Sequence, residues 1–215
     1  MDDTLIRSIR NSYDSLADEY ARRLFHELEQ KPFDRAFLNR FIAHVGRGEV
    51  CDMGCGPGHV ARFLHDAGMK VLGLDLSPRM LEQARQLNPG ISFREGDMLA
   101  LDLENETLAG ITAFYAIVNF PPHSLLKAFK EMARVLQPGG LLLLAFHVGD
   151  EVLHESELWG RPIDMNFFLF RTAFVRDQLA AAGFTIEEVA ERGPYSPEVE
   201  YQSHRAYIFA RKPQP

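Results

Sequence analysis

The segment from residue 49 to residue 58 constrains the fold more than any other part of the sequence. Its first four residues, EVCD, have the pattern of a short strand, and Gly54, Gly56 and Gly58 follow at alternate positions before a helical pattern begins. Glycines in such a turn permit a sharp bend and a close approach of the backbone to a ligand. A strand, a glycine-rich turn and a helix in succession predict an α/β sheet with a nucleotide-like site at the carboxyl end of the strand.

Acidic residues close the next two apolar runs. Asp75 follows the run at 71–74, and Asp97 follows the run at 91–93. Because the carboxyl ends of parallel strands meet at one edge of a sheet, both carboxylates are expected beside the glycine turn. There Asp75 is suited to accept hydrogen bonds from a ribose diol. Asp97 is suited to accept one from an adenine amino group, with Met98 packed against the base.

The glycine spacing discriminates between two classes of nucleotide. A dinucleotide-binding turn has a glycine where this chain has His59, and that glycine helps to cradle a pyrophosphate. The pattern therefore favours a ligand without a pyrophosphate. An NAD(P)-dependent oxidoreductase, which shares the strand, glycine and acid order, is the less favoured enzyme class.

Apolar runs alternate with amphipathic stretches along the rest of the chain, as in βαβ units. Two helices, separated at Pro32, are predicted within residues 5–45. The predicted strands are 50–53, 71–74, 91–93, 111–118, 141–146, 185–190 and 202–211, and the later helices are 59–67, 78–86, 124–136 and 174–182. This order predicts an α/β, Rossmann-like, mostly parallel seven-stranded sheet with helices on both faces and an antiparallel C-terminal hairpin at one edge.

These segments together resemble the class I S-adenosylmethionine-dependent methyltransferases, specifically the small bacterial members of the methyltransferase 11/25 type. The matching stretches are Tyr13, 52–58, 73–77, 96–98 and 134–140. The resemblance implies one methyltransferase domain over residues 1–215. Its parts would be a helical cap at 1–48, a cofactor-binding core at 49–147, and an acceptor-side segment with the C-terminal strands at 148–215.

The resemblance also implies S-adenosyl-L-methionine as cofactor, S-adenosyl-L-homocysteine as product, and roles for individual residues. Gly54, Gly56 and Gly58 would surround the amino-acid end of the cofactor, while Asp52 would bind its ammonium group or stabilise the turn. Asp75 would hold the ribose, and Leu76 and Met98 would flank the adenine. Tyr13 and Tyr20 lie on a helix that folds over the cofactor as a lid in similar proteins, although core packing is an equal alternative for aromatic residues at helical spacing. Asp97 and Tyr115, both at strand ends, complete the expected cofactor site.

Methyl transfer from a sulfonium is an in-line displacement, so the protein contributes mainly by positioning the acceptor and excluding water. A base is required only when the acceptor must lose a proton. The candidates are Asn119, which can orient an acceptor but cannot take its proton, and His147 and His154, which titrate near neutrality. Alternatively, both histidines are packed or solvated residues without a role in catalysis. Residues 149–172 are expected to close over the pocket.

Other features restrict the partners. The stretch Asn119-Phe120-Pro121-Pro122 differs from the motif of nucleic-acid amino methyltransferases because Phe120 interrupts it, and the net charge is −7. A small-molecule substrate is therefore expected, and neither a nucleic-acid partner nor a metal is expected. No membrane span is expected either, since no apolar run approaches the ~20 residues that a membrane span needs. The two cysteines, Cys51 and Cys55, lie within the strand and turn and suggest a reducing, cytoplasmic compartment. A monomer and a homodimer are equally compatible with the sequence, and a non-catalytic S-adenosylmethionine-binding module is a further alternative.

Overall fold

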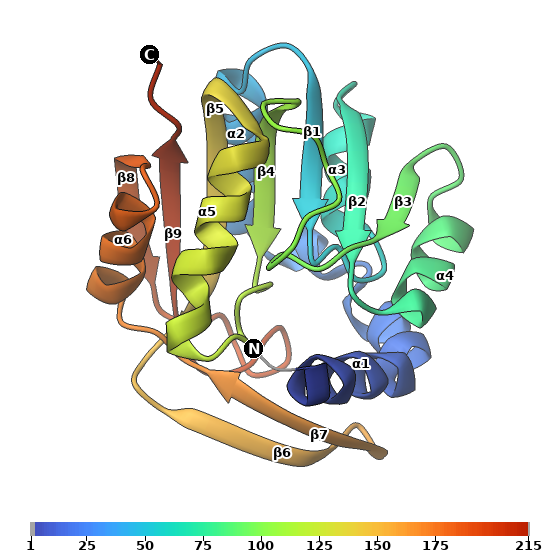
Figure 1. Ribbon diagram of the computed structural model, residues 1–215. Helices are drawn as coiled ribbons and strands as arrows, with labels where there is room; N and C mark the ends of the chain where they lie inside the picture. The colour runs from blue at the N-terminus through green and yellow to red at the C-terminus, as the bar shows by residue number, and fades with distance from the viewer. Residues whose placement is uncertain (1–2, 215) are drawn as a thin grey trace.

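The strands assemble in the order β3-β2-β1-β4-β5-β9-β8 (Figure 1). This computed structural model describes residues 3–214, so residues 1, 2 and 215 of the expected domain lie outside the described part. The strands of this sheet are β1 (Glu49–Met53), β2 (Lys70–Asp75), β3 (Ser92–Glu95), β4 (Leu108–Phe114), β5 (Leu136–Val148), β8 (Thr185–Arg192) and β9 (His204–Arg211). Neighbouring strands from β3 to β5 are parallel, and β9 is antiparallel to both β5 and β8. The predicted α/β fold class and the antiparallel C-terminal hairpin are confirmed.

Helices cover both faces of this sheet (Figure 1). One face carries α2 (Pro32–His44), α3 (His59–Asp66) and α4 (Pro78–Leu87), and the other carries α5 (Leu125–Val135) and α6 (Thr172–Ala181). Successive residues of β1 enter opposite cores: Val50 packs with the first group and Cys51 with the second. Because a parallel sheet is buried on both faces, its strands are apolar at consecutive positions. This packing leaves the carboxyl edge of the parallel strands as the place for a site.

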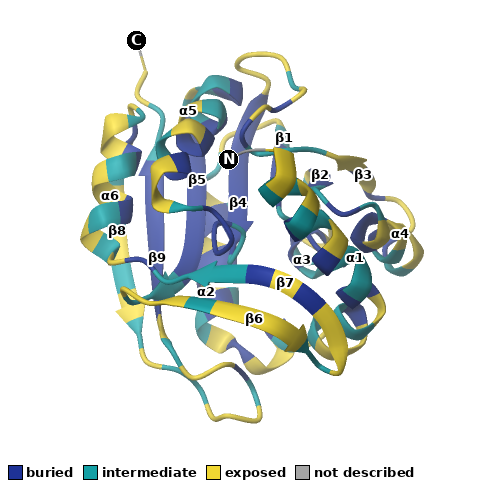
Figure 2. Ribbon diagram, turned by 60° about the horizontal axis from the view of Figure 1, so that its bottom comes forward, coloured by how far each residue is buried: buried dark blue, intermediate teal, exposed yellow. Residues whose placement is uncertain are grey.

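A helix and a separate hairpin lie across that edge (Figures 1 and 2). The helix is α1 (Asp3–Leu24), and the hairpin consists of β6 (Val152–Leu158) and β7 (Arg161–Phe168). Serines on one face of α1 bond to the backbone of β7: Ser8 Oγ donates to Asp164 O at 2.7 Å, and Asp164 N donates to Ser12 Oγ at 3.0 Å. We refer to α1 and β7 together as the cover. Two short 3-10 helices, η1 (Glu27–Gln30) and η2 (Pro122–Ser124), connect other elements.

The structure corrects two of the expected strand assignments. The strand predicted over 111–118 ends at Phe114, because the chain turns at Tyr115, whose φ is 54°. The sequence pattern predicts no strand between residues 149 and 172, where the structure has β6 and β7. The break before Pro32 is confirmed, since α2 begins at that residue. Within residues 3–214, no helix has the length and apolar character that crossing a membrane requires.

Candidate functional site

The glycine turn between β1 and α3 has a backbone that requires glycine. Gly54, Gly56 and Gly58 have φ values of 69°, 51° and 84°, all in the left-handed region. The N–H groups of Gly54 and Cys55 both donate to Leu74 O, at 2.8 and 2.9 Å. A Cβ at Gly54 would lie 2.6 Å from the Cβ of Ala116. The turn is thus packed tightly between β2 and the residues that follow β4.

Asp75, at the end of β2, is bonded directly to this turn. Its Oδ2 accepts a hydrogen bond from Gly56 N at 2.8 Å, and its Oδ1 accepts one from Ser77 N at 2.9 Å. Burial raises the pKa of the Asp75 carboxyl above its ordinary value. Each carboxylate oxygen has a second lone pair, so the group can still accept hydrogen bonds from a ligand.

A cavity lies between the glycine turn, the carboxyl ends of β2 to β4, and the cover. The structure brings together most of the predicted site residues in its lining, namely Tyr13, Tyr20, Gly54, Gly56, Asp75, Leu76, Asp97, Met98, Tyr115 and Asn119. Much of the remaining lining is apolar and was missed by the sequence reasoning: Ile9, Leu74, Met80, Phe114, Ala116 and Phe120. These residues have no chemical signature in a sequence, because the same types fill any core.

Asp52 and Gly58 lie beneath the turn, outside the cavity lining. Asp52 is buried, and its carboxylate accepts hydrogen bonds from Ala61 N and from Thr112 Oγ1, both at 3.0 Å. Burial raises the pKa of Asp52 to about 7. These contacts connect the end of β1 to α3 and β4, and both expected roles of Asp52 stay predictions. Gly58 packs against Asn88 and precedes the first residue of α3.

The two candidate histidines also lie outside the cavity lining, and they are not close together in the fold. His147, at the end of β5, stacks behind Tyr115 with ring centroids 4.9 Å apart, and its Nδ1 lies 2.6 Å from Ser203 Oγ. Burial and the neighbouring Arg205 lower the pKa of His147 to about 3, so its imidazole is neutral at pH 7. His154 lies on the exposed strand β6, with Nδ1 3.1 Å from Asn166 Oδ1. Among the described residues, His, Cys, Asp and Glu form no group of three or more suited to holding a metal.

Tyrosines of α1 form one wall of the cavity. Tyr13 and Tyr20 meet edge to face with centroids 6.2 Å apart, and Tyr20 contacts Trp159 in the same way at 5.8 Å. Tyr13 Oη donates to Asn119 Oδ1 at 2.7 Å. These tyrosines pack beside a small core that includes Leu16 and Met165, and they also line the cavity, while their role as a lid over the cofactor stays a prediction.

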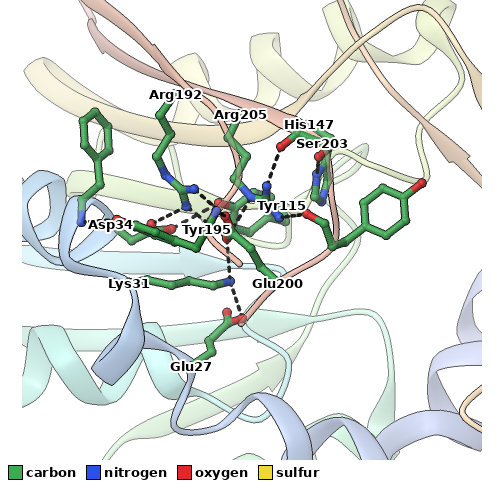
Figure 3. Close-up of polar contacts among 12 residues, drawn as sticks. Glu27, Lys31, Asp34, Tyr115, His147, Arg192, Tyr195, Glu200, Ser203 and Arg205 are labelled. Carbon is green, nitrogen blue, oxygen red and sulfur yellow. Dashed lines mark hydrogen bonds and ion pairs between the residues drawn. The ribbon is translucent and has the colours of Figure 1, made fainter. Parts of the chain in front are cut away.

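A buried charge network behind the cavity was not predicted (Figure 3). Glu200, with a side chain that is 2% exposed, is its centre. Its Oε1 lies 2.5 Å from an Arg192 nitrogen, and its Oε2 lies 3.2 Å from Arg205 Nε and 3.7 Å from Lys31 Nζ. Lys31 also pairs with Glu27 at 2.6 Å. The network thereby connects the N-terminal helices to the last two strands.

The same network fixes Tyr115 from behind. Asp34 accepts hydrogen bonds from Tyr115 Oη at 3.2 Å and Tyr207 Oη at 3.0 Å, and it pairs with Arg192 at 2.9 Å. Tyr115 lines the cavity while its hydroxyl is held by this buried acid. This part of the cavity wall is therefore fixed by the network behind it.

The residues present fit an adenosyl ligand. Leu76 and Met98 supply apolar surfaces beside the acids Asp75 and Asp97, and Asp97 Oδ1 accepts from Leu99 N at 2.8 Å. Asp97 Oδ2 has no hydrogen-bond partner among residues 3–214 and is available to an amino group.

The end of the glycine turn that leads into α3 does not fit a pyrophosphate. His59 stands at the position of the third dinucleotide-binding glycine, and its Nε2 pairs with Glu27 Oε1 at 3.0 Å. Burial alone would raise the pKa of the Glu27 carboxyl, but its contacts with His59 and Lys31 lower it to about 2. An imidazole bonded to this carboxylate therefore stands where a dinucleotide-binding turn has a glycine.

Comparison with known proteins decides between the nucleotide classes. Residues 50–140 match the family model described as a methyltransferase domain. These residues belong to the methyltransferase-domain family. They include the glycine turn and both acids, Asp75 and Asp97, and end at Gly140. The part of the chain that carries the predicted cofactor residues is thus similar to methyltransferase domains.

Relatives extend the similarity beyond this methyltransferase domain. The malonyl-[acyl-carrier protein] O-methyltransferase of Pectobacterium atrosepticum is 32% identical over 72% of this chain and 59% of its own length. The trans-aconitate 2-methyltransferase of Methylobacterium nodulans is 40% identical over 59% of this chain and 49% of its own length. The chain therefore spans about half to three-fifths of these two relatives. A solved S-adenosylmethionine-dependent methyltransferase from Methanosarcina mazei has the same fold, with a TM-score of 0.72, 16% identity, and coverage of 80% of this chain and 96% of its own.

Proposed function

We propose that this protein transfers a methyl group from S-adenosylmethionine to a small-molecule acceptor and releases S-adenosylhomocysteine. One observation carries the proposal. The Asp75 carboxylate is bonded to the glycine turn and, with Asp97 and Met98, lines a cavity at the carboxyl edge of the sheet. The family of residues 50–140 and the names of the similar methyltransferases support it.

Different residues of the cavity would bind different parts of the cofactor. Asp75 would accept hydrogen bonds from the ribose, Leu76 and Met98 would flank the adenine, and the side-chain-free Gly54 and Gly56 would admit the amino-acid end. When bound, the cofactor supplies an electrophilic methyl group on a sulfonium. Tyr13 and Tyr20 would exclude water from that centre, and their aromatic faces suit a neighbouring cation.

In this proposal neither candidate histidine acts as the base. His147 lies behind the Tyr115 ring and is neutral with a pKa near 3, and His154 is on the exposed strand β6. Catalysis would then come from holding the acceptor in line with the methyl group in a dry cavity. The two relatives are named for different acceptors, so neither acceptor is assigned to this chain.

The proposal extends to the setting in which the protein works. The net charge of −7 disfavours a nucleic-acid acceptor. Cys51 and Cys55 are both free and buried, which suits a reducing, cytoplasmic compartment. We infer a protein that acts as a monomer or homodimer.

The test is turnover with a panel of metabolites. The full chain is incubated with S-adenosylmethionine and acceptors grouped as carboxylic acids, phenols, amines and thiols, and S-adenosylhomocysteine is measured by mass spectrometry. The proposal predicts acceptor-dependent formation of S-adenosylhomocysteine by at least one group. Tight binding of cofactor with no turnover in any group would favour a non-catalytic binding module instead.

A further inference from the structure

Asn119 lies where the cover meets the sheet. It belongs to the turn that follows β4, and it is only 5% exposed. Its Oδ1 accepts the Tyr13 hydroxyl of α1 at 2.7 Å, and its Nδ2 donates to the main-chain oxygen of Asn166 in β7 at 2.9 Å. One amide therefore bonds both halves of the cover at once.

These contacts change the role expected of Asn119. The sequence suggests that its amide orients the acceptor by hydrogen bonding. In the structure the carbonyl and the amino group are each already engaged with the chain. Each atom can still make one further hydrogen bond, so Asn119 could contact an acceptor only while its amide is held in place by the cover.

The other polar connections of the cover lie mostly at β3 and α4, where Arg10 pairs with Glu95 and Gln83 donates to Asp18. Ser8 and Ser12 connect α1 to β7, but they join the two halves of the cover to each other. Asp14 accepts from Ser77 Oγ at 2.5 Å, and this contact ties α1 to the region beside β2. A second attachment lies at Phe168, whose N–H donates to Val118 O at 2.7 Å, adjacent to Asn119. Of these contacts, the Asn119 amide alone reaches α1 and β7 together.

We propose that Asn119 is a positioning residue that latches α1 and β7 over the cavity and thereby slows release of the bound cofactor. The proposal rests on the proposed function for the identity of that cofactor. The latch itself is a property of the ligand-free chain. Loss of either bond would leave a buried polar group unpaired, which favours an opened cover.

The Asn119→Asp substitution tests the latch with an internal control. A carboxylate can still accept from Tyr13, but it places an oxygen against the Asn166 carbonyl, where no donor remains. Protonation would restore a donor at that point, and the burial of position 119 should raise the pKa of the introduced carboxyl enough for protonation at pH 5. The S-adenosylhomocysteine dissociation rate, measured by stopped flow, should rise at least about fivefold at pH 8 and return toward the wild-type rate at pH 5. Asn119→Ala should accelerate release at both pH values.

A second measurement needs no cofactor. Hydrogen exchange of the ligand-free full chain, compared with wild type at the same pH, should be faster in both α1 and β7 for Asn119→Asp and for Tyr13→Phe. Asn39→Asp makes the same chemical change on the exposed face of α2 and should alter neither measurement. The effects of Tyr13→Phe and Asn119→Ala on the release rate, expressed as free energies, should also be non-additive in the double variant, because both substitutions remove the same bond.

The outcomes separate the latch from the proposed function. If wild type binds S-adenosylhomocysteine but both Asn119→Asp at pH 8 and Asn119→Ala release it at the wild-type rate, the latch is wrong and the proposed function stands. If wild type does not bind S-adenosylhomocysteine, the proposed function fails. Hydrogen exchange then decides on the latch alone, and unchanged exchange in α1 and β7 overturns it.

Discussion

The Gly56 N–H donates to Asp75 Oδ2 over 2.8 Å, so the carboxylate expected to bind a ribose also holds the turn expected to bind the amino-acid end of the cofactor. This bond joins the ends of β1 and β2, which are adjacent in the sheet. The two halves of the proposed site are consequently built as one unit. Substitutions at either end should affect ligand binding through both.

Asp75→Ala should weaken S-adenosylhomocysteine binding by about 10- to 100-fold. The variant loses hydrogen bonds from a charged acceptor, which contribute about 1.5–3 kcal/mol each. Titration calorimetry on the full chain measures the change. Asp102→Ala, at an exposed aspartate, is the matched control. An affinity equal to that of wild type in Asp75→Ala would refute the ribose assignment.

Gly54→Ala should destabilise the fold by about 3 kcal/mol or more. The substitution adds a Cβ 2.6 Å from the Cβ of Ala116 at a residue with φ of 69°. Overpacking and a left-handed non-glycine residue each cost about 1–3 kcal/mol. Gly68→Ala separates the two effects, because Gly68 has φ of 87° with nothing within 4 Å of the added Cβ. Urea unfolding should give a clearly smaller loss for Gly68→Ala, and equal losses would contradict the steric argument.

The partly buried imidazole of His147 should make the fold less stable in mild acid. Burial and Arg205 lower its pKa from 6.5 to about 3, so between these values the unfolded chain binds a proton that the folded chain does not. The contribution of neutral His147 to the free energy of unfolding is therefore fully present above pH 6.5 and is lost as the pH falls toward 3. Relative to His147→Gln, wild type should lose about 2 kcal/mol of unfolding free energy between pH 7 and pH 5. His204→Gln, at the exposed start of β9, controls for the removal of an imidazole. A parallel pH dependence of wild type and His147→Gln would show that His147 is not buried in this way.

Glu200→Gln should cost about 3–5 kcal/mol of stability. The change leaves the cations of Lys31, Arg192 and Arg205 without the carboxylate between them, and removal of one partner from a buried ion pair has a cost of this size. Glu198→Gln makes the same change at an exposed position two residues earlier. Chemical denaturation of both variants checks the prediction, and similar midpoints would mean that the network contributes little.

The core of the fold could be predicted because periodicity and glycine placement are local signals. The run at 71–74 followed by Asp75, for example, identifies both a strand and its carboxyl end. The prediction failed where local pattern and tertiary packing differ. Residues 115–118 are apolar enough to extend β4, yet the chain turns at Tyr115, which lines the cavity and whose hydroxyl reaches Asp34.

The cavity lining was predictable where residues stand at the ends of the parallel strands, whereas the position of His147 was not. His147 does end β5, but the sequence cannot tell that its ring lies behind Tyr115. The charge network joins Lys31, Asp34, Glu200 and Arg205, which are far apart in the sequence, and charged residues are usually solvated. Arg205 offered one signal in the sequence, because it directly precedes the apolar run of β9. In the structure its side chain is 2% exposed.

The central claim is that the cavity binds an adenosyl ligand without a pyrophosphate. Titration calorimetry of the full chain with S-adenosylhomocysteine and, separately, with NAD⁺ and NADH tests it most directly. We predict saturable one-to-one binding of S-adenosylhomocysteine and no binding of either dinucleotide. Binding of NAD⁺ or NADH without binding of S-adenosylhomocysteine would contradict the account.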